Sequence, residues 1–270
     1  TFIINGAERV IVSQIVRSPG VVFKEGKKSD VSSLSYTGTL YPYSGTKLEF
    51  VLTRKNEKTD ASKKDNEKKK VNNIIQVNFG KKPFLVTFFL RVLGIDTREK
   101  IVSAFYSPKT IKIDDVISEN GHYFLFKDIA DEDRVVRFVA GSEVGTVELQ
   151  EMKDMGISEI EVVDTPAKDL DAPALAVLKT LSREAVYIER EDKESVYRNE
   201  QSEDFQNEYI GCIVEACKNT LPQNLKTFPD PKRVISYFQE FFLHGRGFEL
   251  SDIGRHKLNK KFYGMDEDKY

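Results

Sequence analysis

The sequence predicts an α+β protein in which mixed β-sheets and helices occupy successive parts of the chain. Residues 34–52 and 73–79 carry the alternation of apolar and polar residues that is typical of half-buried strands. Phe84 to Leu93 is instead apolar on nearly every helical face, as in a core helix. Further short strand patterns fill 109–163, and amphipathic helical patterns follow. Segregated strands and helices favour the α+β class.

Length and charge set the first limits on function. The 270 residues exceed the usual single domain, and a content of 40% hydrophobic residues is enough for a sizeable core. The 41 basic and 43 acidic residues give a net charge of -2, which excludes a globally basic nucleic-acid binder but allows a local basic face. Cys212 and Cys217 have neither zinc-site spacing nor an obvious disulfide partner, so we expect buried thiols in a reducing compartment. The sequence shows neither a membrane span nor a secretion leader.

The N-terminal stretch is the most densely patterned part of the chain. Strand-like runs at 2–4 and 10–12 flank Asn5-Gly6, the strongest short hairpin signal. Pro19 and Gly20 then break the second strand, since proline cannot donate to a sheet ladder and glycine lets the backbone reverse. Because 24–33 is polar, we place a domain boundary after Phe23, with one piece over 1–23 and one domain over 24–270 that packs as far as Phe262.

Strands and helices follow in order. Two strands are predicted in 34–52, joined at Ser44-Gly45. Residues 54–70 include eight basic and four acidic residues, and we expect them to form a mobile hairpin tip. This tip is either a basic finger near nucleic acid or a solvated loop. Pro83 opens the first helix, and Thr97 caps a second that exposes Arg98, Glu99 and Lys100 and buries Ile101, Val102 and Phe105. A short helix over 147–155 and a strand over 158–164 come next, and further helices are predicted over 171–182, over 205–221 and around 234–242.

The last helix has a dense basic end. Ser251 is placed to cap it, and Arg255, His256, Lys257, Lys260 and Lys261 follow within three turns. These cations either bind phosphate or offset the helix dipole. No catalytic motif accompanies them: the Gly245-x-Gly247 pair lacks a third glycine, Asp114 and Asp115 diverge, and His122 is expected to be structural. The sequence therefore predicts no catalytic residue and no metal site.

Three motifs resemble one family. G-x-E-R-V-I-V-S-Q followed by R-S-P-G-V in 6–21, P-Y-x-G-x-x-L-E-F in 42–50, and L-x-x-x-G-R-x-K-x-N in 250–259 are similar to strings of the bacterial RNA polymerase beta subunit. The turn before Pro83 and the helical hairpin after it also match. The resemblance implies a polymerase fragment, with the end of the protrusion domain over 1–23 and the lobe domain over 24–270.

The resemblance also implies roles for single residues. Arg17 matches an arginine at the inner wall of the main cleft, near the non-template DNA strand, while Val12 and Gln14 match positions that border the rifamycin pocket. Lys81, Lys82, Arg255 and Lys257 are further candidate DNA contacts. Lys47 is a candidate as a cation only, because many bacterial relatives carry a tryptophan there and its stacking role does not transfer.

The implied function is that of a non-catalytic wall of the DNA cleft in a nucleotidyltransferase, the DNA-directed RNA polymerase. The family holds catalytic magnesium mainly on the other large subunit, so no cofactor is expected in this fragment. Implied partners are DNA, the beta-prime and alpha subunits and sigma factor, in the cytoplasm at the bacterial nucleoid. The alternative is an independent protein-interaction or regulatory module with basic loops.

Overall fold

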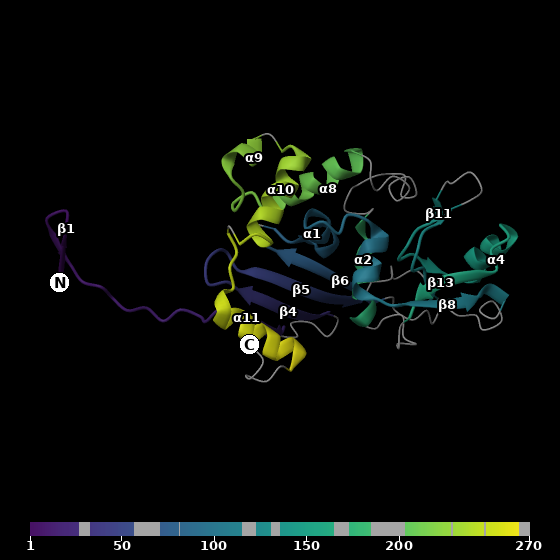
Figure 1. The fold of residues 1–270 in the computed structure, drawn as a ribbon, viewed down its shortest axis with the longest axis horizontal. Coiled ribbons are helices and arrows are strands. Elements are labelled where there is room, and N and C mark those ends of the chain that lie inside the picture. The colour runs from purple at the N-terminus through teal and green to yellow at the C-terminus, as the bar shows by residue number, and fades with distance from the viewer. Residues whose placement is uncertain are drawn as a thin grey trace, which may run out of the picture.

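A computed structural model describes residues 1–26, 33–56, 71–80, 82–114, 123–130, 136–164, 173–184, 203–227, 229–245 and 247–264. Helices and antiparallel sheets are combined in it, which confirms the α+β class. The chain begins with a hairpin of β1 (Phe2–Ile4) and β2 (Ala7–Arg9). Figure 1 shows this hairpin far from the body, joined to it by an extended segment. The apolar residues of 2–16 are strongly exposed, with Ile11 at 78% and Val16 at 81%.

A five-stranded antiparallel sheet forms the centre of the body. Its order is β3-β4-β5-β6-β7, in chain sequence, so each strand pairs with its predecessor. The strands are β3 (Gly20–Glu25), β4 (Ser33–Tyr41), β5 (Leu48–Asn56), β6 (Val71–Asn78) and the short β7 (Phe84–Leu85). The predicted turn at Ser44-Gly45 connects β4 to β5, while the charged segment between β5 and β6 lies largely outside the described residues.

Four helices cover the β6–β7 side of this sheet and bury the largest apolar cluster. They are α1 (Val86–Val92), α8 (Glu203–Ala216), α9 (Gln223–Thr227) and α10 (Pro231–Phe242). Phe79 makes edge-on ring contacts with Phe238, Phe241 and Phe242, the last at 5.0 Å between centroids. Such contacts stabilise aromatic pairs by about 0.5–1.5 kcal/mol beyond burial. The predicted apolar helix after Pro83 therefore lies in the core, as its sequence indicated.

The middle of the chain adds a second set of elements beside the sheet. These are α2 (Arg98–Phe105), β8 (Pro108–Lys112), β9 (Tyr123–Phe124), β10 (Ile129–Ala130), β11 (Val136–Phe138), β12 (Glu143–Val144), α4 (Thr146–Asp154), β13 (Glu159–Val163), a 3-10 turn η1 (Pro173–Leu175) and α5 (Ala176–Leu181). β8 pairs with β13, and α4 covers them in a small core of its own. Leu175, Leu178 and Leu181 are fully buried, as their helical spacing predicted.

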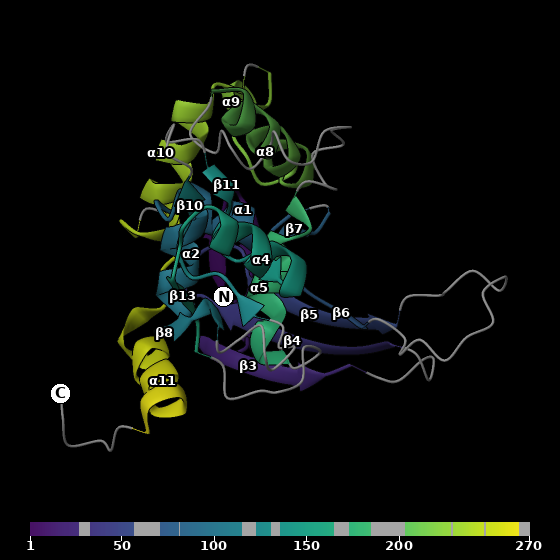
Figure 2. The ribbon, with the colours of Figure 1, turned by 90° about the vertical axis from the view of Figure 1, so that its right-hand side faces the viewer.

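The last helix, α11 (Ser251–Tyr263), stands apart from the others. Figures 1 and 2 show α8, α9 and α10 above the strands and α11 below them, beside the β3 edge. Its C-cap Gly264 adopts the left-handed conformation that commonly ends a helix. Because α11 packs against β3, residues near the two ends of the described chain lie side by side.

A buried ionic cluster joins α1, α2 and the end of α5. The Arg91 guanidinium donates to both carboxylate oxygens of Glu184, at 3.3 and 3.0 Å. Arg98 donates to the carbonyls of Ala140 and Leu181 at 2.8 and 3.2 Å, and lies 3.8 Å from the same carboxylate. All three charged side chains are essentially inaccessible to solvent. Satisfying so many donors is what makes burial of these charges tolerable.

Several local predictions are wrong. Arg98 is buried, because backbone carbonyls accept its hydrogen bonds, and Phe105 is 51% exposed at the end of α2. Pro83 precedes β7 and not a helix. Ser251 does not cap α11: the cap position belongs to Leu250, and the Ser251 hydroxyl is buried without a hydrogen-bond partner among the described residues.

The N-terminal hairpin is shifted from its predicted register. Asn5 and Gly6 take positive φ of 50° and 76°, as the Asn-Gly turn predicted, but the second strand is Ala7–Arg9 and not 10–12. A two-residue turn pairs Ile4 directly with Ala7, so the last residue pair of the hairpin is Phe2 with Arg9. The exposed segment ends at Ser18, and β3 runs across residues 23 and 24. The division after Phe23 stays a prediction.

Candidate nucleic-acid interface

A basic cleft lies where α11 meets the segment that leads into β3. It has a volume of about 480 Å³, and its walls are Arg17 to Val22 on one side and Lys257, Lys260 and Lys261 on the other. All its charged lining residues are cationic. Of the predicted DNA contacts, Arg17 and Lys257 are thereby brought together, although 239 positions separate Lys257 from Ser18, the neighbour of Arg17.

Direct contacts fix α11 to the start of β3. The Lys257 Nζ donates to the Ser18 Oγ at 2.6 Å, and the Lys261 Nζ donates to the Val21 carbonyl at 2.9 Å. The rings of Phe23 and Phe262 meet edge to face, with centroids 5.8 Å apart. Gly254 allows the close approach, because a Cβ there would lie 3.0 Å from the Pro19 Cβ.

The hydrogen bonds of the two lysines leave their charge uncompensated. A hydroxyl accepts from Lys257 and a carbonyl accepts from Lys261, and neither acceptor carries a negative charge. The Arg17 guanidinium lies over the neutral ring of Tyr41, 4.8 Å from its centroid. This stacking restrains the planar guanidinium group, and Arg17 stays exposed to solvent. Such a geometry suits bidentate binding of phosphate. The contacts seen for Arg17, Lys257 and Lys261 are therefore all with neutral groups, which leaves these three cations able to attract an anion.

The other predicted DNA contacts lie elsewhere. Lys47 pairs with Glu49 at 2.8 Å, and Lys82 pairs with Glu215 at 2.8 Å in a separate depression between α8 and α9. Arg255 is exposed on α11 but does not line the basic cleft, and Lys81 lies outside the described residues. Val12 and Gln14 are exposed in the extended segment before Arg17. The DNA contacts and the rifamycin-pocket positions all stay predictions.

Sequence reasoning missed part of the cleft. Tyr41 ends β4 and received no role, and Ser18 was read only as part of a chain reversal. Lys260 and Lys261 are evidently basic, but no local pattern indicates that they lie across the cleft from Arg17. The one available signal was that Arg17 and the cations of 255–261 belong to the two most distinctive motifs.

The described residues offer little for other chemistry. Burial raises the pKa of the Cys217 thiol to about 12, which makes it a poor nucleophile. Across the described ranges, no three His, Cys, Asp or Glu side chains gather as a metal-binding group. None of the helices in the described part of the chain is long and apolar enough to cross a membrane.

Comparison of the chain with models of known protein families finds no match. Individual curated proteins do match it over almost its whole length. The chain is 35% identical over 280 residues to the DNA-directed RNA polymerase subunit beta of Borreliella burgdorferi, covering 99% of the chain and 20% of that protein. It is 32% identical over 277 residues to the subunit of the same name from Treponema denticola, covering all of the chain and 21% of that protein.

The chain thus spans about a fifth of the length of the curated relatives that it matches. The similarity extends well beyond the three motifs, because it covers nearly every residue between them. The resemblance read from those motifs is confirmed. The chain is a homologue of one segment of the DNA-directed RNA polymerase subunit beta.

Proposed function

We propose that this chain is a non-catalytic wall of the DNA cleft of a bacterial RNA polymerase, and that its basic cleft holds the DNA backbone. The observation that carries the proposal is the meeting of Arg17, Lys257, Lys260 and Lys261 at one surface. Phosphate contacts supply most of the sequence-independent affinity for DNA, and clustered cations make such contacts. The homology to a segment of the beta subunit supports the proposal, because it places the chain in a polymerase, where the cleft would face DNA.

The proposed mechanism is electrostatic positioning. A backbone phosphate enters beside the edge of the Arg17 guanidinium, which Tyr41 already holds. Lys260, in the last turn of α11, lies on the opposite wall of the same cleft. Little side-chain entropy is lost on binding, because stacking and hydrogen bonds have restricted Arg17 and Lys257 beforehand. A strand held in this way is guided along the wall without being read base by base.

The remaining roles follow from the same assembly. The exposed apolar residues of 2–16 suit packing against another part of the subunit, as expected for a protrusion segment. We place DNA, the beta-prime and alpha subunits and sigma factor as partners, and the cytoplasmic nucleoid as the location. Catalytic magnesium belongs to another subunit in this proposal, so the chain alone adds no nucleotides. An independent interaction module is the weaker alternative, since nearly the whole chain is similar to one polymerase segment.

The salt dependence of duplex DNA binding by the chain tests the proposal. We expect weak binding without sequence preference, since few phosphates are engaged. Each lost phosphate contact lowers the slope of log affinity against log salt by roughly 0.9. The double variant Arg17→Gln, Lys260→Gln should therefore lower the slope by about twice that amount.

A charge-matched control is Lys109→Gln with Lys112→Gln, two exposed lysines of β8. This control should keep the slope of the unmodified chain. Equal slopes for both double variants would place DNA binding outside the basic cleft. Tight binding at physiological salt, or a strong preference for one base sequence, would contradict backbone positioning.

A further inference from the structure

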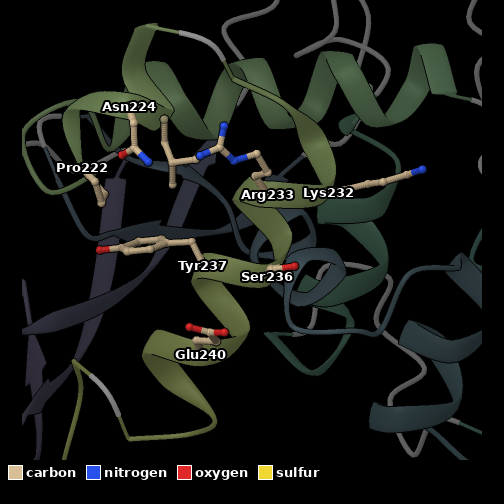
Figure 3. A pocket seen from close by; sticks show the side chains of 8 residues that line it. Pro222, Asn224, Lys232, Arg233, Ser236, Tyr237 and Glu240 are labelled. Carbon is tan, nitrogen blue, oxygen red and sulfur yellow. The ribbon is translucent and has the colours of Figure 1, made fainter.

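A second open groove, of about 440 Å³, lies between α9 and α10, on the opposite side of the sheet from α11. Arg233, Ser236, Tyr237 and Glu240 line it from α10, with Pro222 and Asn224 across from them. Figure 3 shows the Tyr237 ring reaching toward Pro222, the Arg233 side chain rising toward α9, and the Lys232 side chain pointing away along the surface.

The four α10 residues form one face of the helix. Their spacing of three, four and seven residues aligns them along a single stripe. The opposite face carries Val234 and Phe238, which are fully buried in the main core. The stripe is thus rigidly mounted while its own side chains face the groove. Arg233 and Glu240 are separated by two helical turns, or roughly 10 Å.

Tyr237 gives the groove a fixed apolar floor. Its ring contacts those of Phe238 and Phe241, with centroids 5.8 and 5.7 Å away. Pro222 faces it from the start of α9, so the two make a slot in which an aliphatic or aromatic side chain can insert. A ring anchored by its neighbours loses little entropy when it is covered.

The charges of the groove are unequal at its two ends. Lys232 and Arg233 both lie in the first turn of α10, where the helix dipole disfavours cations, so their placement is not explained by helix stability. Among the described residues, neither of their side chains has a carboxylate within salt-bridge distance. Glu240 lines the other end and carries the opposite charge.

We propose that the α9–α10 groove binds an acidic peptide segment of a partner protein. An aspartate or glutamate pairs with Arg233, and a neighbouring apolar side chain enters the slot between Tyr237 and Pro222. A nucleic-acid strand fits less well, because its continuous phosphates would meet the Glu240 carboxylate. The proposal is independent of the basic cleft, which lies at the other side of the molecule.

Fluorescence anisotropy with the whole chain tests it. The probe is a labelled hexapeptide with adjacent aspartate and leucine residues and otherwise uncharged side chains. The comparison probes are the same peptide with asparagine in place of aspartate and a short oligothymidine strand. We expect the acidic peptide to bind, and the asparagine peptide to bind at least about tenfold more weakly, because a charge-assisted hydrogen bond is lost.

The variant Arg233→Gln should weaken the acidic peptide by a similar factor, while Arg9→Gln, an exposed arginine of the N-terminal hairpin, should not. Failure of the acidic peptide to bind, or equal binding of the asparagine peptide, would overturn the proposal. So would oligothymidine binding that is lost in Arg233→Gln, because the groove would then be a nucleic-acid surface.

Discussion

The ammonium group of Lys257 hydrogen-bonds the hydroxyl of Ser18 at 2.6 Å, and so links the final helix to the segment that carries Arg17. The contact lies where α11 packs beside the start of β3. Gly254 and Pro19 define that approach, because any side chain at 254 would point into the proline ring. The geometry of the basic cleft therefore depends on a glycine that lines none of it.

Replacing Gly254 by valine should destabilise the chain by about 1–3 kcal/mol, the usual cost of overpacking. Its Cβ would lie 3.0 Å from the Pro19 Cβ and 3.3 Å from the Leu250 Cβ, so α11 would have to move away from β3. Urea unfolding measures the change. Gly211→Val is the matched control, because no atom lies within 4 Å of a Cβ at that helical position. A loss of stability at 211 as large as that at 254 would refute the packing argument.

Replacing Glu184 by glutamine should destabilise the fold by about 3–5 kcal/mol, because the buried Arg91 and Arg98 would lose the carboxylate that both of them face. The control is Glu215→Gln, which removes a solvent-exposed partner of Lys82 and should cost less than about 1 kcal/mol. Chemical denaturation measures the free energy of unfolding of both variants and compares the buried with the exposed ion pair. Similar small changes in the two variants would mean that the buried cluster contributes little.

Cys217 should not react with a thiol-specific disulfide reagent while the chain is folded. Its thiol is inaccessible, and burial holds its pKa near 12, so raising the pH from about 7 to about 9 should produce no thiolate there. After the chain is unfolded in urea, the Cys217 thiol should react with the reagent. In the variant Cys212→Ser, the folded chain should therefore consume almost no reagent at either pH. Rapid labelling of this folded variant would show that the core around α8 opens readily.

Local chemistry allowed much of the fold to be predicted. Asn5 and Gly6 form the turn that their tolerance of positive φ indicated, and the stripe of Leu175, Leu178 and Leu181 is buried as its spacing required. The buried Arg98 was missed because its two carbonyl acceptors lie 42 and 83 positions away. A charged residue near a helix start otherwise indicates an exposed site.

The basic cleft could be predicted only in part, for the same reason. Arg17 and Lys257 were identified singly from motifs, but their proximity depends on β3 and α11 packing together across nearly the whole chain. Lys47 and Lys82 shared the same basic character, yet neighbouring carboxylates pair with both. Charge alone therefore does not indicate which lysines lie in the cleft.

The lifetime of promoter complexes tests the central claim most directly. The polymerase would be reconstituted with the full-length subunit that contains this segment, either unchanged or with Arg17→Ala. Because Arg17 is exposed and its guanidinium stacks on the Tyr41 ring at the surface, the unfolding temperature of the chain should be nearly unchanged. Loss of a charge-assisted contact to DNA should shorten the complex lifetime by about tenfold.

Lys109→Ala, at an exposed position of β8, serves as the control and should keep the original lifetime. Shortened lifetimes in Arg17→Ala alone, with unchanged folding, are the result that DNA positioning by the basic cleft predicts. If Arg17→Ala instead lowers the unfolding temperature while assembled complexes keep the lifetime of the unmodified enzyme, Arg17 is a structural residue and the proposed role of the cleft is contradicted.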